Sequence, residues 1–587
     1  MEKVAQGRGE ASYTRRQRLE QLNAQLEIER SSFKSHWREL SDYILPRRSR
    51  FFVNDANRGD KRNQKIIDPT ATLAVGTLRS GMMGGVTSPA RPWFRLSIPD
   101  KNLAEYGPVK EWLHTVTTRM TTVFLRSNLY NILPSIYGDL GTFGTAAMLI
   151  DGDQDQGIKC YSFPVGSYKI GTDSKGRVRI FWRDFQMTAR QVVEKFGMDP
   201  DNPGKIKWDN ISTHVKSLWD SKNSESRVDI AHVILPNELY DPKLLDSKYK
   251  KFASIYYERG TSGQRNSQGY FGSGGGQDKF LREKGYDYFP VLCPCWEVTG
   301  EDIYGTSCPG MIALGDIKQL QTGERRGLQA IEKMINPPMV GPISLKTQNA
   351  SIIPGDITYV DVRDGMQGFR PAHEVRFDIN ALEAKQDQVR KRISKTFYED
   401  LFLMLASSDR RQITATEIDE RREEKLLALG PVLEQLNQDL LDPLIDNTFS
   451  ILEEAGEIPP PPDEIAGADL KVEYISIMSQ AQKLVGLGGI ERFTNFVSGI
   501  AQIAPEILQK IDGDQVVDYY ADLTSIPPGI VRSDKQAQGI RQQQAEAQAQ
   551  QQQAEQAAMA ASTAKDLSQA DPNGDNALKA LAQNGGI

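Results

Sequence analysis

The sequence predicts an α+β fold organised around two long helices that carry a compact β-rich insert. In residues 309–336 and again in residues 379–405, apolar side chains recur three or four positions apart, which is the spacing of one helix face. These side chains are Ile317, Leu320, Leu328, Ile331 and Ile335 in the first segment and Leu382, Val389, Ile393, Phe397 and Leu401 in the second. Residues 337–378 are dense in Pro and Gly, and residues 357–362 alternate as a short strand does. Two arms of about 26 residues, each roughly 40 Å long, predict an antiparallel pair with a small domain at its far end.

The first 308 residues predict two amphipathic helices and a mixed α/β region. Residues 14–45 carry a helical stripe of Leu19, Leu22, Leu26, Phe33, Trp37, Leu40 and Ile44, which either packs on its own domain or docks on a neighbouring subunit. Residues 107–127 carry a second stripe. Strand-like runs follow at 145–150, 158–163, 178–182, 228–235, 252–258 and 288–298, with a short helix at 187–197.

The bulk composition limits the classes of function. A net charge of -6 and a pI near 5.7 argue against a protein that coats DNA with a basic surface. These values remain compatible with a channel through which DNA slides without sticking. Four cysteines fit a reducing compartment, and we expect neither a signal peptide nor a membrane span, because no long apolar run is present.

Several short motifs resemble catalytic or ligand-binding sites only in part. The glycines near residues 81–85 suggest close backbone packing or a turn, because no Gly-Lys-Ser/Thr follows to make a phosphate loop. Asp151, Asp153 and Asp155 begin like a calcium loop but lack its later Gly and Glu, so a solvated hairpin turn is favoured. Cys293, Cys295 and Cys308 do not have zinc spacing, which favours buried thiols. We therefore expect no enzyme, no cofactor and no metal, although carboxylates distant in sequence can converge in space.

Glycines and basic residues in the two arms each allow two interpretations. Gly323 and Gly327 lie four apart on one helix face, so they mark either a local helix break or a close approach between helices. The second arm carries Arg390, Lys391, Arg392 and Lys395. This basic run is either a solvated face balanced by nearby acids or a positive surface that meets the DNA backbone.

The last third of the chain is predicted to be largely helical. Residues 414–458 continue an apolar stripe through Pro431 and Pro443, which predicts a long kinked helix. Four prolines at 459–462 form a stiff boundary, and residues 468–526 contain further helical patterns. The Gln- and Ala-rich residues 531–562 are either disordered or a helix supported by identical neighbours, and we favour the helix. We expect residues 563–587 to be a disordered tail.

Three phrases, in this order along the chain, resemble a known family. They are GTLRSGMMGGVTSPARPWF near the N-terminus, QTGERRGLQAIEKMINPP in the first arm and SSDRRQITATEI after the second arm. With the helix–insert–helix pattern they resemble the portal (head-to-tail connector) proteins of short-tailed, T7-like bacteriophages. The resemblance extends over roughly residues 12–530.

The resemblance implies a division into the parts of a portal fold. Residues 1–308 and 414–458 would form the wing, 309–336 and 379–405 the stem helices, and 337–378 the clip. Residues 406–413 would form the tunnel loop, 463–530 the crown, and 531–562 a possible C-terminal helical barrel. The stem glycines Gly323 and Gly327 would let helices of neighbouring subunits pack side by side.

The resemblance also implies a function. Twelve copies would form a ring at one capsid vertex, which conducts double-stranded DNA during packaging and ejection. The implied partners are other copies of the chain, DNA bound without sequence preference, the terminase large subunit, major capsid and scaffolding proteins, and tail adaptor proteins, but no membrane. The ring would assemble in the host cytoplasm and reside in the virion. The candidate DNA-channel residues are Arg390, Lys391, Arg392, Lys395, Ser407, Ser408, Asp409, Arg410 and Arg411. The alternative is a capsid scaffold or adaptor that conducts no DNA.

Overall fold

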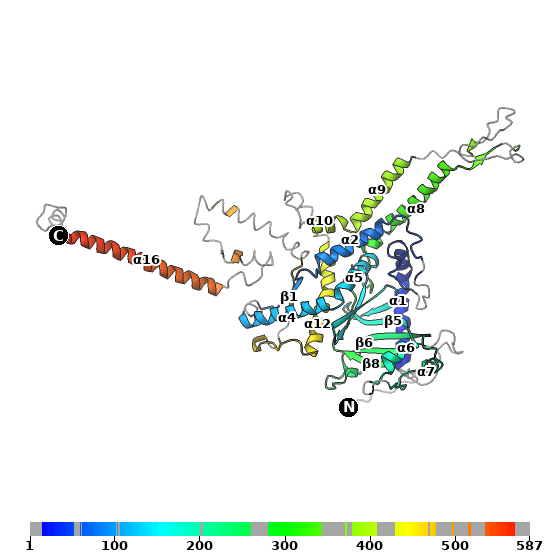
Figure 1. Cartoon of the computed structure of the whole chain (residues 1–587), viewed down its shortest axis with the longest axis horizontal. Coiled ribbons are helices and arrows are strands. Elements are labelled where there is room, and N and C mark those ends of the chain that lie inside the picture. Colours follow the sequence, from blue (N-terminus) through cyan, green and yellow to red (C-terminus); the bar gives the residue numbers. More distant parts are fainter. Residues whose placement is uncertain are drawn as a thin grey trace, which may run out of the picture. The chain divides into compact units, whose positions relative to one another are not determined.

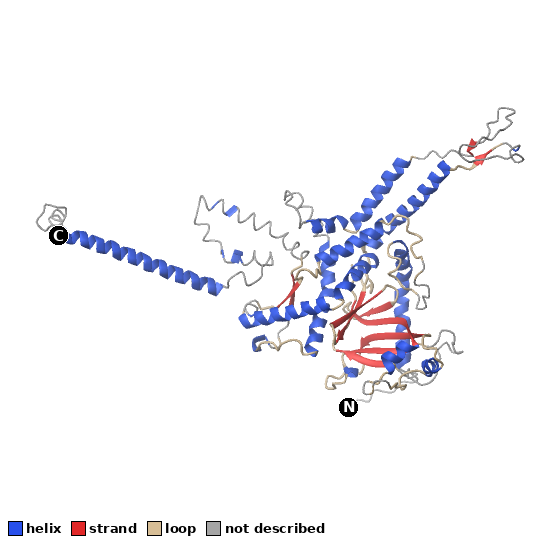
Figure 2. Cartoon of the chain, viewed as in Figure 1, coloured by secondary structure: helices blue, strands red, loops and turns tan. Residues whose placement is uncertain are grey.

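The chain forms two compact units in the computed structural model, Met1–Gln482 and Lys483–Ile587. The structure describes residues 15–51, 61–100, 106–199, 205–259, 280–341, 378–407, 429–465, 470–476 and 534–569, with short pieces at 59, 103, 202, 343, 370–371, 467, 496–497, 500, 513 and 515–517. Helices and strands are mixed in the first unit, as expected for an α+β fold (Figure 2).

Helices and strands of the first unit have the following bounds. The α-helices are α1 (Arg15–Tyr43), α2 (Thr70–Gly85), α4 (Gly107–Arg126), α5 (Leu129–Phe143), α6 (Ala189–Val192), α7 (Thr213–Asp220), α8 (Pro309–Ile335), α9 (Ile379–Thr396), α10 (Glu399–Ser407) and α12 (Asp442–Glu454). The strands are β1 (Phe94–Ser97), β2 (Ala147–Asp153), β3 (Gly157–Phe163), β4 (Tyr168–Thr172), β5 (Val178–Thr188), β6 (Arg227–Pro236), β7 (Phe252–Glu258), β8 (Arg282–Tyr286), β9 (Val291–Leu292), β10 (Met339–Val340), β11 (Arg370–Pro371) and β12 (Lys471–Tyr474).

A five-stranded antiparallel sheet with the order β4-β5-β6-β7-β8 is covered on both faces. Helix α1 runs along one face, where Leu19 and Leu26 pack with Trp182, Val233 and Tyr257 (Figure 1). The short helices α6 and α7 cover the other face with a separate apolar cluster. Side chains along a strand point alternately to the two faces of the sheet. Successive residues of β5, β6 and β7 therefore belong in turn to the cluster beneath α1 and to the cluster beneath α6 and α7.

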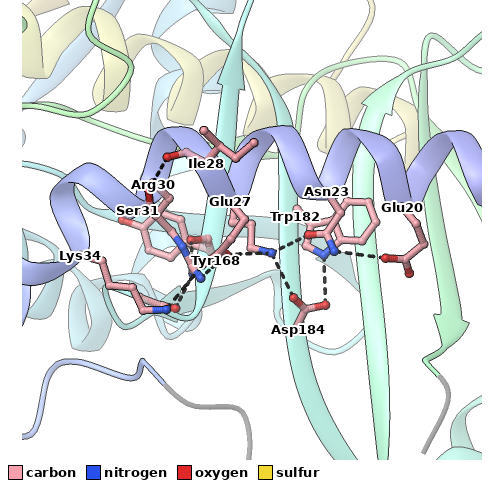
Figure 3. A network of polar contacts seen from close by, with 12 residues as sticks. Glu20, Asn23, Glu27, Ile28, Arg30, Ser31, Lys34, Tyr168, Trp182 and Asp184 are labelled. Atoms are coloured by element: carbon pink, nitrogen blue, oxygen red, sulfur yellow. Dashed lines mark hydrogen bonds and ion pairs between the residues drawn. The ribbon is translucent and has the colours of Figure 1, made fainter. Parts of the chain in front are cut away.

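A buried polar network fixes α1 on the sheet (Figure 3). The Lys169 ammonium of β4 donates to the Asn23 side chain and lies 3.2 Å from Glu27 and 3.4 Å from Asp184. Burial lowers the pKa of Lys169, although the two carboxylates oppose that shift. Arg30 donates to the backbone oxygen of Gly166 at 2.6 Å. Helix α1 therefore packs on its own chain, which decides between the two interpretations of its apolar stripe.

A larger core joins α2, α4, α5 and the base of the α8–α9 pair. Its fully buried side chains include Trp37, Leu78, Leu140, Ile317 and Ile393. The glycine phrase of the sequence lies in helix α2 rather than in a turn. A Cβ atom at Gly81 would overlap the ring of Phe402, so close packing is the correct interpretation of this glycine.

Most of the predicted strands and helices of the N-terminal half are confirmed, with specific differences. Helices α1 and α4, the β2–β3 hairpin, and strands β5, β6 and β7 lie where the sequence places them. Helix α5, which contains Pro134, and strands β4 and β8 were not predicted. Residues 288–298 contribute only the two-residue strand β9. Of residues 187–197, the first two end strand β5, and the rest form α6 followed by a π-helical turn.

The second arm differs from the prediction of one continuous helix. Helix α9 ends at Thr396, and Tyr398 has a left-handed backbone with φ of 56°. Helix α10 then begins at Glu399 in a new direction (Figure 1). The apolar stripe continues through this break because Phe397 and Leu401 are both buried in the same core. Periodicity alone therefore could not reveal the turn.

Residues after 428 also differ in part from expectation. Residues 429–436 are helical, a π-helical turn spans Asn437–Leu441, and α12 follows with Pro443 near its start. The predicted kink is thus a π-turn placed where the proline removes a backbone donor. Within residues 468–526, where the sequence predicts helices, Lys471–Tyr474 is instead strand β12, paired antiparallel with β1.

The second unit contains one long described helix, α16 (Asp534–Gln569). Its 36 residues confirm a helix in the Gln- and Ala-rich segment. The helix continues seven residues past position 562, so residues 563–569 are not part of a disordered tail.

Candidate nucleic-acid interface on the α8–α9 pair

Helices α8 and α9 lie side by side as an antiparallel pair (Figure 1). A Cβ atom at Gly323 would lie 3.5 Å from the Gln386 amide, and one at Gly327 would lie 2.9 Å from Leu382. The later glycine of α8 therefore contacts the earlier residue of α9, which is the order that an antiparallel pair requires. Helix α8 is continuous from Pro309 to Ile335, so neither glycine breaks it. Both glycines permit close approach of α9 from the same chain.

Strands β10 and β11 follow the far ends of the two helices. Met339 pairs with Pro371 and Val340 with Arg370 in a two-stranded antiparallel ladder. The predicted strand at 357–362 lies outside the described residues.

Arg390 is held in three ion pairs and is only one-third exposed. Its guanidinium donates to Asp68 at 2.9 Å, to Asp387 at 2.7 Å and to Glu324 at 2.5 Å. Burial raises the pKa of Asp68, but hydrogen bonds from Thr70 and the Arg390 contact outweigh this, so the net pKa shift is downward. Arg390 therefore joins α9 to α8 and to the segment before α2.

Arg392 makes a two-pronged ion pair across the same helix pair. Its Nε and Nη2 atoms donate to the two carboxylate oxygens of Asp316 at 3.0 and 2.7 Å. The hydrogen bond from Arg392 lowers the pKa of Asp316. Bidentate geometry of this kind orients both side chains.

Lys391 and Lys395 are exposed, as Arg392 is, but they differ from the two arginines in their ion pairing. They lie one helical turn apart on α9, on the side opposite the buried Val389 and Ile393. Among the residues that the structure describes, neither lysine has an ion-pair partner. They form the part of the predicted basic run that remains open to a ligand.

Helix α8 adds cations that sequence reasoning missed. Arg325, Arg326 and Lys333 are exposed. Arg326 and Lys333 lie seven residues apart, two turns along one helix face, opposite the buried Leu320 and Gln321. The signal was available, since these residues fall opposite the apolar stripe of the first arm.

The predicted loop residues are placed only in part. Ser407 is the last residue of helix α10. Ser408, Asp409, Arg410 and Arg411 lie outside the described residues. The structure thus brings Arg390, Lys391, Arg392 and Lys395 together on α9 and leaves the remaining candidates as predictions.

The aspartate and cysteine motifs that resemble metal sites take part in the packing and turns of the fold. Asp151 and Asp153 belong to β2, and the Asp153 carboxylate accepts the backbone N–H of Asp155 in the hairpin turn. Cys293, Cys295 and Cys308 are buried free thiols, and burial raises the pKa of each. In the described ranges, no three His, Cys, Asp or Glu side chains group as metal ligands do.

Comparison with known proteins defines the class of this chain. Residues 16–531 match the family described as bacteriophage head to tail connecting protein. The chain therefore belongs to that family. None of the helices in the described part of the chain has the length and apolar character needed to cross a membrane.

Two relatives narrow the class to portal proteins, as the resemblance predicts. The portal protein of Salmonella phage epsilon15 is 46% identical over 574 residues, which cover 98% of this chain and 99% of the relative. The probable portal protein of Bordetella phage BPP-1 is 43% identical over a match that covers 97% of this chain and 98% of the relative. Neither name denotes an enzyme. A chain of the native gene transfer agent virion covers 78% of this chain and 91% of itself at 9% identity and a TM-score of 0.31, which supports no argument about the fold.

Proposed function

We propose that copies of this chain form a ring, expected to have twelve subunits, at one capsid vertex and that double-stranded DNA passes through its channel. In this proposal the α8–α9 pair is the stem, residues 337–378 are the clip, and residues 406–413 are the tunnel loop. Residues 1–308 and 414–458 form the wing, 463–530 the crown, and α16 lies in a C-terminal barrel. The similarity to portal proteins over nearly the full chain supports this division.

The observation that carries the DNA-channel proposal is the contrast within the basic run of α9. Arg390 and Arg392 are paired with carboxylates of the same chain, whereas Lys391 and Lys395 lie exposed on one stripe and pair with no carboxylate among the described residues. A conduit requires cations that attract the phosphate backbone without base-specific contacts. In a ring, this stripe would repeat once per subunit. We therefore assign DNA contact to the two lysines and a positioning role to the two arginines.

The partners follow from the same proposal. The clip end would dock the terminase large subunit during packaging and tail adaptor proteins afterwards. The wing would contact major capsid and scaffolding proteins in the host cytoplasm, and the assembled ring would remain in the virion. No reaction is assigned to any side chain.

The ring is tested by the mass and shape of the purified chain. Twelve copies of the 65.6 kDa chain give about 787 kDa by light scattering, with a central hole in negative-stain images. A protein that fails to form rings even with capsid and scaffolding proteins present would contradict the conduit and favour an adaptor.

The lysine assignment is tested by salt-dependent binding of double-stranded DNA to assembled rings. Lys391→Gln with Lys395→Gln should lower the slope of log affinity against log salt by about 2 per subunit that contacts DNA. The thermal midpoint should remain unchanged because both side chains are exposed. Arg390→Gln is the control, since it should lower the midpoint and leave the slope nearly unchanged. An unaltered slope in the lysine variant would contradict the assignment.

A further inference from the structure

A transverse row of polar side chains crosses the face of the five-stranded sheet opposite α1. Arg183 of β5 is paired in register with His232 of β6, His232 with Tyr256 of β7, and Tyr256 with Arg282 of β8. Residues directly opposite in an antiparallel ladder point to the same face, so all four side chains emerge together. This row is far from the stem candidates in sequence and belongs to no role assigned above.

Two cations lie over one aromatic ring in the middle of this row. His232 stacks on Tyr256 with ring centroids 3.8 Å apart and nearly parallel planes. Arg282 and Lys195 lie 4.9 and 5.0 Å from the centre of the same Tyr256 ring. Because the His232 ring covers one face of the Tyr256 ring, Arg282 and Lys195 lie over its other face. Their charges therefore lie near each other.

The third cation, Arg183, lies between two further rings, and its hydrogen bond with the Tyr256 side chain brings it toward the other two cations. Its guanidinium carbon lies 4.2 Å from the ring centre of Phe185 and 4.8 Å from that of Phe163. The Nε atoms of Arg183 and Arg282 are buried and make no hydrogen bond. In the part of the chain that the structure describes, no carboxylate lies within ion-pair distance of these two arginines or of Lys195.

The three cations repel one another. Partial burial of its ammonium, followed by the charges of Arg282 and Arg183, lowers the pKa of Lys195 to about 8. The field of Asp151 acts on both Lys195 and Arg282, but its carboxylate pairs with neither. Three positive charges against this one carboxylate leave two uncompensated. Aromatic faces lessen this repulsion only in part.

We propose that Arg183, Lys195 and Arg282 form a binding site for a dianionic phosphate group, supplied as inorganic phosphate or as the terminal phosphate of a nucleotide. A dianion neutralises the two uncompensated charges, whereas a single carboxylate would leave one. Guanidinium groups match phosphate oxygens in a two-pronged geometry, and an ammonium supplies a further donor. The site lies in the proposed wing, but it does not depend on ring formation.

Isothermal titration calorimetry of the full-length protein tests the site, with inorganic phosphate and AMP as separate probes and sodium chloride at matched ionic strength as the blank. Saturable binding of at least one probe is expected. Lys195→Gln and Arg282→Gln should each weaken it by about tenfold, because each removes a charge-assisted contact. Tighter binding of AMP would identify a nucleotide, and equal or tighter binding of phosphate would identify the free ion.

Arg177→Gln is the matched control, because Arg177 is an exposed cation beside the same sheet that pairs with Asp173. It should retain binding within about twofold. Lys195 is exposed, so its variant should fold, and equal thermal midpoints will establish this. Absence of saturable binding of both probes, or equal weakening in Arg177→Gln, would overturn the proposal.

Discussion

Helices α1 and α8 are similar in length and in apolar patterning, yet they are covered differently. The stripe of α1 is covered from Leu19 to Leu40 by the sheet and the central core, with only Leu22 and Phe33 partly buried and its other members buried. The stripe of α8 is buried only near its base, where Ile317 is fully enclosed, whereas Leu328 is 58% and Ile335 is 79% exposed. An apolar stripe therefore reveals that a helix face can be covered, but not whether its own chain covers it.

The polar sides of the two helices show the same contrast. On α1, Lys169 and its partners are enclosed between helix and sheet. On the α8–α9 pair, Arg392 and Asp316 meet at the surface. Ion pairs at a surface contribute little to stability because water screens them, whereas breaking an enclosed pair leaves a charge without a partner. We therefore expect the base of α8 and the α1 network to maintain the fold.

The largest expected effect compares two isoleucines of α8. Ile317→Ala should lower the free energy of unfolding by about 2–5 kcal/mol, because it opens a cavity in a packed core. Ile335→Ala should change it by less than about 0.5 kcal/mol, since the side chain is exposed within the chain. Chemical denaturation of the two variants under identical conditions measures both values. Equal losses of unfolding free energy in the two variants would show that the far half of α8 is as well covered as its base.

A smaller effect is expected for the network beneath α1. Lys169→Met should cost about 1–3 kcal/mol, because Glu27 and Asp184 lose an enclosed cationic partner. Lys34→Met is the matched control, since Lys34 approaches the same Glu27 from the surface and should contribute less than about 1 kcal/mol. The difference in thermal midpoint between the variants measures the effect of enclosure. An equal fall in thermal midpoint for Lys34→Met and Lys169→Met would show that enclosure does not distinguish the two lysines.

The smallest effect concerns the glycines of α8. Gly323→Ala should stabilise the protein by about 0.5–1 kcal/mol, because an added Cβ makes an ordinary contact and the unfolded chain loses freedom. Gly327→Ala should be nearly neutral, since Leu382 must move to admit the methyl group. Thermal unfolding compares them. A marked loss in both variants would show that neither site has room for a methyl group beside α9.

The sequence predicted those helices and strands that have a local periodic pattern of apolar residues. Helices α1, α4 and α8 and the β2–β3 hairpin each have a regular apolar pattern, and each forms as predicted. Helix α5 was missed because Pro134 interrupts its pattern, and tertiary packing in the core overrides that interruption. Strand β12 was missed because its partner β1 lies far away in sequence. Pairings of this kind leave no periodic signal.

The sequence predicted which residue types the candidate site contains, but not which of these residues are paired within the chain. Four basic residues on one helix suggested a charged surface, but the sequence could not show that Arg390 is paired with Asp68, more than 300 positions away. It also could not show that Lys391 and Lys395 face away from their own chain. Composition identifies the charges, and only the fold identifies the partners that neutralise them.

The continuity of α8 has a mechanical consequence. A helix is stiff along its axis, and α8 extends without a break from Ile335, which three residues separate from β10, to Gly310, which lies so close to the backbone of Thr142 that no side chain fits between them. A load applied at the strand end is therefore transmitted to α5 without slack. Helix α9 ends two residues before the left-handed Tyr398, so the second arm is interrupted where it enters the core. One helix of the pair therefore transmits an axial load straight into the core, whereas the other is divided into two helices at that level.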